Sequence, residues 1–248
     1  SISKQLERAF RKRGIDYKLG VRFQSVTQHD SGVVISLEDG TVIEAEYLLV
    51  AVGRGPSTQG MGFEAVGVQM DRGFVLTNER LATNVPGVFA VGDIVPGLQL
   101  AHRGYQQGIF VAEEIAGLAP VVVSDTNIPK ITYCDPEVAS VGLTQAKAVE
   151  EYGSDNVSAY EYNLAGNAKS EILGTAGTVK VVRVNDGPVV GVHMIGARVG
   201  ELIGEAQMIV NWEAYPEDVA PFIHAHPSQN ESIAEAMLNL AGKPLHTM

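Results

Sequence analysis

The stretch GTVKVVRVNDGPVVGVHMIG (Gly177–Gly196) consists of two apolar runs joined through Asn185-Asp186-Gly187. Asn, Asp and Gly tolerate the backbone angles of tight turns, so this pattern predicts two antiparallel strands that form a hairpin. The segments that flank this hairpin indicate the kind of domain to which it belongs.

Helical segments lie on both sides of the hairpin. TQAKAVEEYG precedes it, with Thr144 as the expected N-cap and Gly153 beyond the expected end. VGELIGEAQMIVNW and PSQNESIAEAMLNLAG follow it as two further predicted helices. Strand, hairpin and helix in this mixture are typical of an α+β domain, which we place at residues 125–248, after the connector LAPVVVSDTNIP.

The first half of the chain has a different pattern. GVVISLEDGTVIEA predicts a hairpin that turns at Asp39-Gly40. YLLVAVG (Tyr47–Gly53) and GVFAVGD (Gly87–Asp93) are continuous apolar runs, which are typical of strands buried on both faces of an α/β sheet. The sequence therefore predicts α/β architecture before the connector and α+β architecture after it.

Two helices are also predicted in the first half. SISKQLERAFRKRG has an apolar stripe and a stop at Gly14, and AHRGYQQGIFVAEEIAG has helical spacing that places Tyr105 and Ile109 inward, with a stop at Gly117. The first helix starts at the first residue without an initiator Met, so we expect the chain to be part of a longer protein.

Composition excludes several classes of function. The net charge is −11, and the absence of any basic run argues against nucleic acid as a partner. No apolar run reaches the roughly 18–20 residues of a membrane span, and no signal peptide is visible. The single cysteine, Cys134, rules out a disulfide within this chain and suggests a reducing, cytoplasmic location.

Two positions at the ends of apolar runs are candidate ligand contacts. Asp93 ends GVFAVGD, where a carboxylate could accept hydrogen bonds from ligand hydroxyls, because ligands of open α/β sheets bind beyond the carboxyl ends of the strands. Gly53 ends YLLVAVG, where the missing side chain would let a ligand approach the backbone. At either position the residue could equally serve only to form a turn.

HAHPSQNE (His224–Glu231) allows three interpretations. Two histidines one residue apart could bind a metal, but no further ligands lie nearby at zinc-site spacing. Pro227 is suited to the first position of a helix, which would make His226 a capping residue. Alternatively, Glu231 could hold one ring nitrogen of His226 and leave the other nitrogen free for proton transfer.

Four segments together resemble one family. TNVPGVFAVGD, QLAHRGYQQG, DPEVASVGLT and HAHPSQNE occur in the order and spacing of the flavin-dependent pyridine nucleotide–disulfide oxidoreductases. The HAHP stretch resembles most closely the members that oxidise dihydrolipoamide, since glutathione reductase relatives share the His-Pro and the later Glu but usually lack the preceding His-Ala. The triplet Ser228-Gln229-Asn230 departs from the commoner Thr-Leu-Ser but keeps the spacing to Glu231.

The resemblance implies a domain organisation and two cofactors. Residues 1–54 would be the end of an NAD-binding domain, 55–124 a second FAD-contacting segment of a Rossmann-like fold, and 125–248 the dimerisation domain. The family's two Gly-rich fingerprints and its Cys-x4-Cys redox pair are not found here, so the chain looks like the C-terminal half of such an enzyme.

The resemblance also implies roles for individual residues. His226 would be the acid–base catalyst, Glu231 its orienting partner, and His224 structural. Asp93 would bond the ribityl chain of FAD, and Gly53 would contact NAD. The flavin would lie along a backbone segment made of Gln99, Leu100, Ala101 and His102.

Partners follow from the same resemblance. The parent enzyme would be a homodimer and would act on the lipoyl domain of a 2-oxo acid dehydrogenase complex. It would pass electrons from dihydrolipoamide through a disulfide and FAD to NAD. Two alternatives are a disulfide reductase of the glutathione or mycothione type and, for the isolated chain, a non-catalytic dimerisation module.

Overall fold

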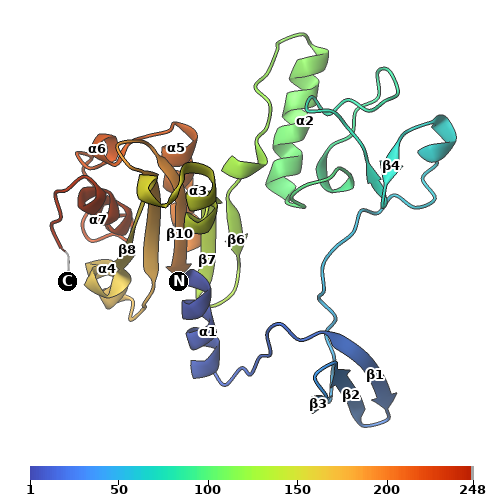
Figure 1. Ribbon diagram of the computed structural model, residues 1–248, viewed down its shortest axis with the longest axis horizontal. Helices are drawn as coiled ribbons and strands as arrows, with labels where there is room; N and C mark the ends of the chain where they lie inside the picture. The colour runs from blue at the N-terminus through green and yellow to red at the C-terminus, as the bar shows by residue number, and fades with distance from the viewer. Residues whose placement is uncertain (247–248) are drawn as a thin grey trace. The chain divides into compact units, whose positions relative to one another are not determined.

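The computed structural model describes residues 1–246, which form two compact units (Figure 1). The larger unit contains Ser1–Lys12 together with the chain from Val122 onward. The smaller unit is Arg13–Val121.

The larger unit is built on a five-stranded antiparallel sheet in the order β6-β7-β10-β9-β8. The predicted hairpin is confirmed: β9 pairs with β10, and Asp186 in the turn has a φ of 53°. This pair, with β7 beside β10, forms the inner part of the sheet. The strands are β6 (Lys130–Thr132), β7 (Glu137–Gly142), β8 (Val157–Asn163), β9 (Thr178–Val184) and β10 (Val189–Gly196).

Helices α5 (Val199–Asn211) and α7 (Glu231–Leu240) share the main core with the sheet. Val192 and Met194 of β10 are fully buried in this core, together with Ile233 of α7. His193, between them in sequence, points to the opposite face, as strand alternation requires. Two layers therefore share the core, and the helices cover one face of the sheet.

The opposite face carries α3 (Gln145–Tyr152) and α1 (Ile2–Lys12). Helix α3 begins where the sequence predicts, because the Thr144 side chain accepts a hydrogen bond from the Lys147 N–H. The remaining helices of this unit are short: α4 (Ala168–Ile172), α6 (Pro216–Val219) and the 3-10 turns η3 (Asp125–Asn127), η4 (Ser154–Asn156) and η5 (Leu164–Gly166).

Tyr162 of β8 provides a test of this core through its phenol group. The residue is only 4% exposed, and its burial raises the pKa of the hydroxyl from 10.0 to about 12. The folded state therefore holds the proton more tightly than the unfolded chain. This contribution to stability is complete below pH 10.0 and is lost as the pH rises through about 12.

We expect Tyr162→Phe to remove this alkaline loss of stability. Two pKa units correspond to about 3 kcal/mol of unfolding free energy. The free energy of unfolding of the wild type, measured with urea, should therefore fall by up to about that amount as the pH rises from 10.0 to about 12. Tyr133→Phe, at an 82% exposed position, is the control and should keep the wild-type pH dependence. Parallel curves for the wild type and Tyr162→Phe would contradict the assignment.

The smaller unit contains a three-stranded antiparallel sheet in the order β1-β2-β3. The predicted hairpin at Asp39-Gly40 is confirmed. The strands of this unit are β1 (Phe23–His29), β2 (Gly32–Leu37), β3 (Val42–Ala45), β4 (Met70–Asp71) and β5 (Phe74–Val75), and its helices are η1 (Glu64–Val66), η2 (Gly92–Ile94) and α2 (Ala101–Ile115). A separate small core forms around Val75 and Val95.

Both predicted buried strands of the first half are wrong. Tyr47–Gly53 forms no strand, and Val52 is 94% exposed. Gly87–Asp93 contributes only an isolated bridge between Ala82 and Phe89 before η2 begins. A doubly buried strand needs neighbouring strands for its N–H and C=O groups, and the described residues place none beside Tyr47–Gly53.

Helix α2 exists as predicted, but its buried face differs. Tyr105 and Ile109 are 74% and 52% exposed, whereas Arg103, Gln107 and Phe110 are buried. The N–H of Gly92 donates to Gln107 Oε1 at 2.8 Å, so a polar contact with η2 fixes the orientation of the helix. The spacing of apolar residues alone could not show that the side-chain amide of Gln107 would be buried and would fix the orientation of the helix.

Candidate active site

The two histidines of HAHPSQNE lie on an irregular loop, residues 220–230, between α6 and α7. Helix α7 begins at Glu231, so the prediction that Pro227 occupies the first helical position is wrong. The His226–Pro227 peptide bond is cis. Just before the helix, the Gln229 carbonyl accepts hydrogen bonds from the Ser232 N–H at 3.0 Å and from the Ser232 hydroxyl at 2.6 Å.

His226 and Glu231 are brought together. His226 Nδ1 lies 2.8 Å from Glu231 Oε1. Because an ionised carboxylate only accepts hydrogen bonds, Nδ1 is the donor, and the lone pair of a neutral ring is then on Nε2. The His226 side chain is 70% exposed, so Nε2 is within reach of a molecule from outside. The pair has the geometry of an oriented base.

Glu231 is fixed from a second side. Its Oε2 accepts a hydrogen bond from the Ser228 N–H at 2.8 Å. Burial raises the pKa of this carboxyl, but the hydrogen bonds from Ser228 and His226 outweigh burial and lower the pKa below 4.5. Glu231 is therefore ionised at neutral pH and supports a positive charge on His226.

His224 engages a different carboxylate. Its Nε2 lies 2.7 Å from Glu205 Oε1, and the ring is only 11% exposed. The two histidines therefore do not share a ligand. Among residues 1–246, no group of three or more His, Cys, Asp or Glu side chains is arranged to hold a metal ion.

Several residues around the loop were not predicted from the sequence. Glu205 Oε2 accepts a hydrogen bond from Asn230 Nδ2 at 2.7 Å, and the buried Asn167 donates to the Ser228 carbonyl at 2.9 Å. Gln229 Nε2 donates to the Ala197 carbonyl at 3.1 Å. The one available signal was Glu205, a charged residue directly before the buried Ala206 in a mainly apolar helix.

The segment expected to contact FAD lies in the smaller unit. Gly92 has a φ of +76°, and a Cβ added to Gly104 would lie 3.3 Å from the Gly92 Cα, so η2 and α2 approach backbone to backbone. Asp93 is exposed. Helix α2 starts at Ala101 without a side-chain cap from Leu100.

These features fit one side of a dinucleotide site. An exposed carboxylate can accept hydrogen bonds from hydroxyl groups, and an uncapped helix start favours negative charge. Gln99, half-buried, donates through Nε2 to the Asp93 carbonyl at 3.3 Å, and His102 is exposed in the first turn of α2. The expected flavin-contacting residues are thus adjacent.

Gly53 lies apart from any described partner. It is exposed, has a φ of +132°, and a Cβ added there would meet nothing within 4 Å. The backbone conformation favours glycine, but the surroundings of this residue do not define a ligand site.

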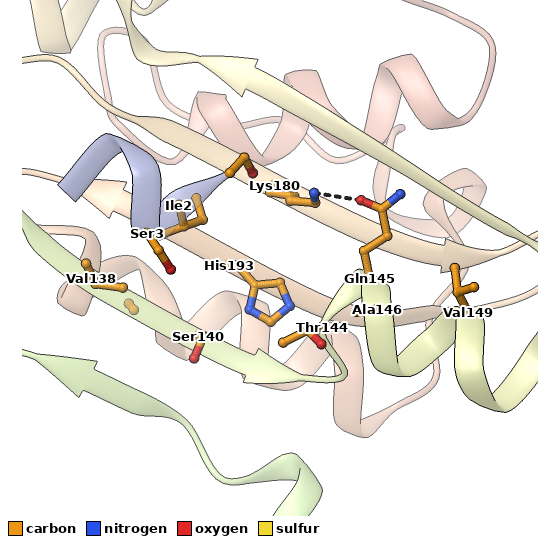
Figure 2. Close-up of a pocket in the computed structure, with 12 residues that line it drawn as sticks. Ile2, Ser3, Val138, Ser140, Thr144, Gln145, Ala146, Val149, Lys180 and His193 are labelled. Carbon is orange, nitrogen blue, oxygen red and sulfur yellow. Dashed lines mark hydrogen bonds between the residues drawn. The ribbon is translucent and has the colours of Figure 1, made fainter. Parts of the chain in front are cut away.

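A cavity of about 610 Å³ lies on the sheet face opposite α5 and α7, between α1, α3 and strands β7, β9 and β10 (Figure 2). Its histidine and its lysine have protein partners. His193 Nε2 donates to the Leu143 carbonyl at 2.9 Å, burial lowers the pKa of this histidine, and Lys180 donates to Gln145 Oε1 at 2.7 Å. The cavity contains no residue expected to act in the chemistry.

No helix within residues 1–246 is long and apolar enough to cross a membrane.

Comparisons with known proteins agree with this geometry. Residues 1–108 match the family model described as pyridine nucleotide-disulphide oxidoreductase, and residues 128–237 match the dimerisation domain of the same family. The mitochondrial dihydrolipoyl dehydrogenase of Pisum sativum is 36% identical over 99% of this chain and 50% of its own length. A dihydrolipoyl dehydrogenase of Bacillus subtilis is 36% identical over 99% of this chain and 53% of its own length.

A solved structure is also similar to this chain. The crystal structure of LpdA from Mycobacterium tuberculosis has a TM-score of 0.88 and 27% identity, and the match covers 96% of this chain and 52% of that one. The chain thus spans about half the length of the relatives that it matches. The mixed α/β and α+β fold class is confirmed.

Proposed function

Because this chain belongs to the pyridine nucleotide-disulphide oxidoreductase family, we propose that it forms the acid–base and dimer-forming half of a dihydrolipoyl dehydrogenase. Relatives in this family use FAD and NAD. The proposed parent reaction is the oxidation of protein-bound dihydrolipoamide to lipoamide, with reduction of NAD.

One observation carries the proposal: the exposed His226 imidazole is held at Nδ1 by Glu231, 2.8 Å away. The reaction requires a base, because a thiol with a pKa near ~8.5 is mostly protonated at neutral pH, whereas the thiolate is the nucleophile. With Nδ1 bonded to Glu231, His226 Nε2 can take the proton of a dihydrolipoamide thiol. Glu231 stabilises the imidazolium that forms, and the proton returns to solvent from Nε2.

The smaller unit would supply part of the FAD site. We assign the ribityl contact to the Asp93 carboxylate and the flavin-facing backbone to Gln99, Leu100, Ala101 and His102. FAD held by these residues would supply two-electron redox chemistry between the dithiol and NAD, and we propose Gly53 as a contact of NAD. Exposed Asp93 and the uncapped start of α2 support this assignment.

The matched dimerisation domain indicates a homodimer. We further propose that the partner substrate is the lipoyl domain of a 2-oxo acid dehydrogenase complex, since lipoamide is the natural product of the proposed reaction. A reducing compartment such as the cytoplasm suits the free thiol of Cys134, which hydrogen-bonds to the Pro136 carbonyl at 3.1 Å.

A reductase of the glutathione or mycothione type is the alternative enzyme. We expect the complete enzyme to prefer dihydrolipoamide with NAD over glutathione disulfide or mycothione disulfide with NADPH by about 100-fold or more in kcat/KM. Steady-state assays of the purified flavoprotein with each pair decide between them. A preference for either low-molecular-weight disulfide would overturn the proposed substrate.

A non-catalytic dimerisation module is the alternative for the isolated chain. Absorbance near the flavin band separates the two cases, since only a chain that retains cofactor is yellow and changes colour with a reducing agent.

A further inference from the structure

We propose that Glu205 is a positioning residue for His226, acting through two loop residues that lie on either side of it in the sequence. This inference rests on the proposed function, in which His226 is the base. The two hydrogen bonds of the Glu205 carboxylate go to residues other than His226. Glu205 acts by fixing His224, two residues before His226, and Asn230, four residues after it.

The loop needs such support because its backbone is irregular. Residues 220–230 belong to no helix or strand, and the His226 side chain is 70% exposed. Packing therefore does little to hold the imidazole. Its place depends on polar contacts that fix the loop backbone, and a catalytic group displaced by about 1 Å loses much of its rate.

Glu205 is suited to hold the loop from a rigid element. It lies on α5, next to the fully buried Ala206, so its backbone is anchored in the core. Its two carboxylate oxygens have different partners: Oε1 accepts from His224 Nε2 and Oε2 from Asn230 Nδ2, both at 2.7 Å. One carboxylate therefore holds the loop on both sides of His226.

Donor and acceptor chemistry gives a sharp test. In Asn230→Asp, a carboxylate replaces the amide that donates to Glu205, so two acceptors with like charge face each other. In the double variant Glu205→Gln with Asn230→Asp, the new amide on α5 can donate to the new carboxylate on the loop, while its oxygen still accepts from His224. The second substitution should therefore repair the first.

A role limited to helix stability gives the opposite expectation. Asn230 occupies the N-cap position of α7, where aspartate is as favourable as asparagine and its negative charge suits the helix dipole. If Asn230 served only α7, Asn230→Asp would be neutral or stabilising, and Glu205→Gln would repair nothing.

The experiment combines activity with a measurement that needs no cofactor. In the complete enzyme, we expect Asn230→Asp to lower kcat for dihydrolipoamide about 10- to 100-fold, with little change in NADH-driven reduction of a dye. In the 248-residue chain, we expect the Ser228 amide, which donates to Glu231, to exchange with deuterium about 10-fold faster in Asn230→Asp. The double variant should return both values to within about 3-fold of wild type.

Glu201→Gln is the matched control, because Glu201 is exposed one turn earlier on α5, and we expect it to change neither value. Unchanged exchange and turnover in Asn230→Asp would overturn the inference, as would a double variant no better than the single one. Wild-type enzyme without dihydrolipoamide activity would instead count against the proposed function, and the exchange data would still report on Glu205.

Discussion

Replacement of His226 by glutamine in the complete enzyme is expected to lower kcat for dihydrolipoamide by about 10²–10⁴-fold, the usual contribution of a general acid–base group. Glutamine keeps the bulk of the side chain and can still donate to Glu231 Oε1, which lies 2.8 Å from Nδ1 in the native pair. It carries no titratable proton, so the thiol must lose its proton to water. Steady-state kinetics with dihydrolipoamide and NAD measure the loss.

Two neighbouring variants serve as controls for this prediction. Glu231→Gln should cost less than His226→Gln, because it removes charge support and orientation but leaves the base in place. His224→Gln should cost least and act mainly through stability, since glutamine can still donate to Glu205. If His224→Gln proved the more damaging histidine variant, or if His226→Gln released a bound metal, the acid–base interpretation would be wrong.

The second large effect concerns the 248-residue chain by itself. We expect it to show no dihydrolipoamide-dependent reduction of NAD, because its single cysteine, Cys134, cannot form the dithiol–disulfide couple that the reaction needs. The loss relative to the complete enzyme should be total within detection. The measurement is NADH formation at several concentrations of chain purified without full-length enzyme.

The control for this prediction is the His226→Gln form of the same chain. Residual turnover that is equal in both forms identifies a contaminant. Turnover that rises in proportion to the chain and falls in its His226→Gln form would contradict the prediction, since it would require a redox group other than a cysteine pair.

The elements defined by local chemistry could be predicted from the sequence. The hairpin at Asn185-Asp186-Gly187 forms because its turn residues and apolar runs agree, and Thr144 caps α3 through a side chain within three residues of its partner. The run Tyr47–Gly53 failed as a strand because a buried strand depends on neighbours that periodicity cannot supply.

In the candidate site, too, the contact between residues close in sequence could be predicted and the contacts between distant residues could not. His226 and Glu231 are five residues apart, so their pairing could be inferred from the spacing, and the structure places them in contact. Glu205 meets His224 across 19 residues and Asn230 across 25, and such contacts arise only from the packing of α5 against the loop. The start of α7 was misplaced because Pro227 suits a first helical position but does not show at which residue the helix begins.

The most direct test of the central claim, that His226 is the base for dihydrolipoamide, is rapid-mixing measurement of flavin reduction in the complete enzyme and its His226→Gln variant. The claim predicts that reduction of the flavin by dihydrolipoamide slows by about 10²–10⁴-fold. Reduction by NADH, which needs no thiol deprotonation, should keep its wild-type rate. Equal slowing of both reactions, or unchanged reduction by dihydrolipoamide, would contradict the claim.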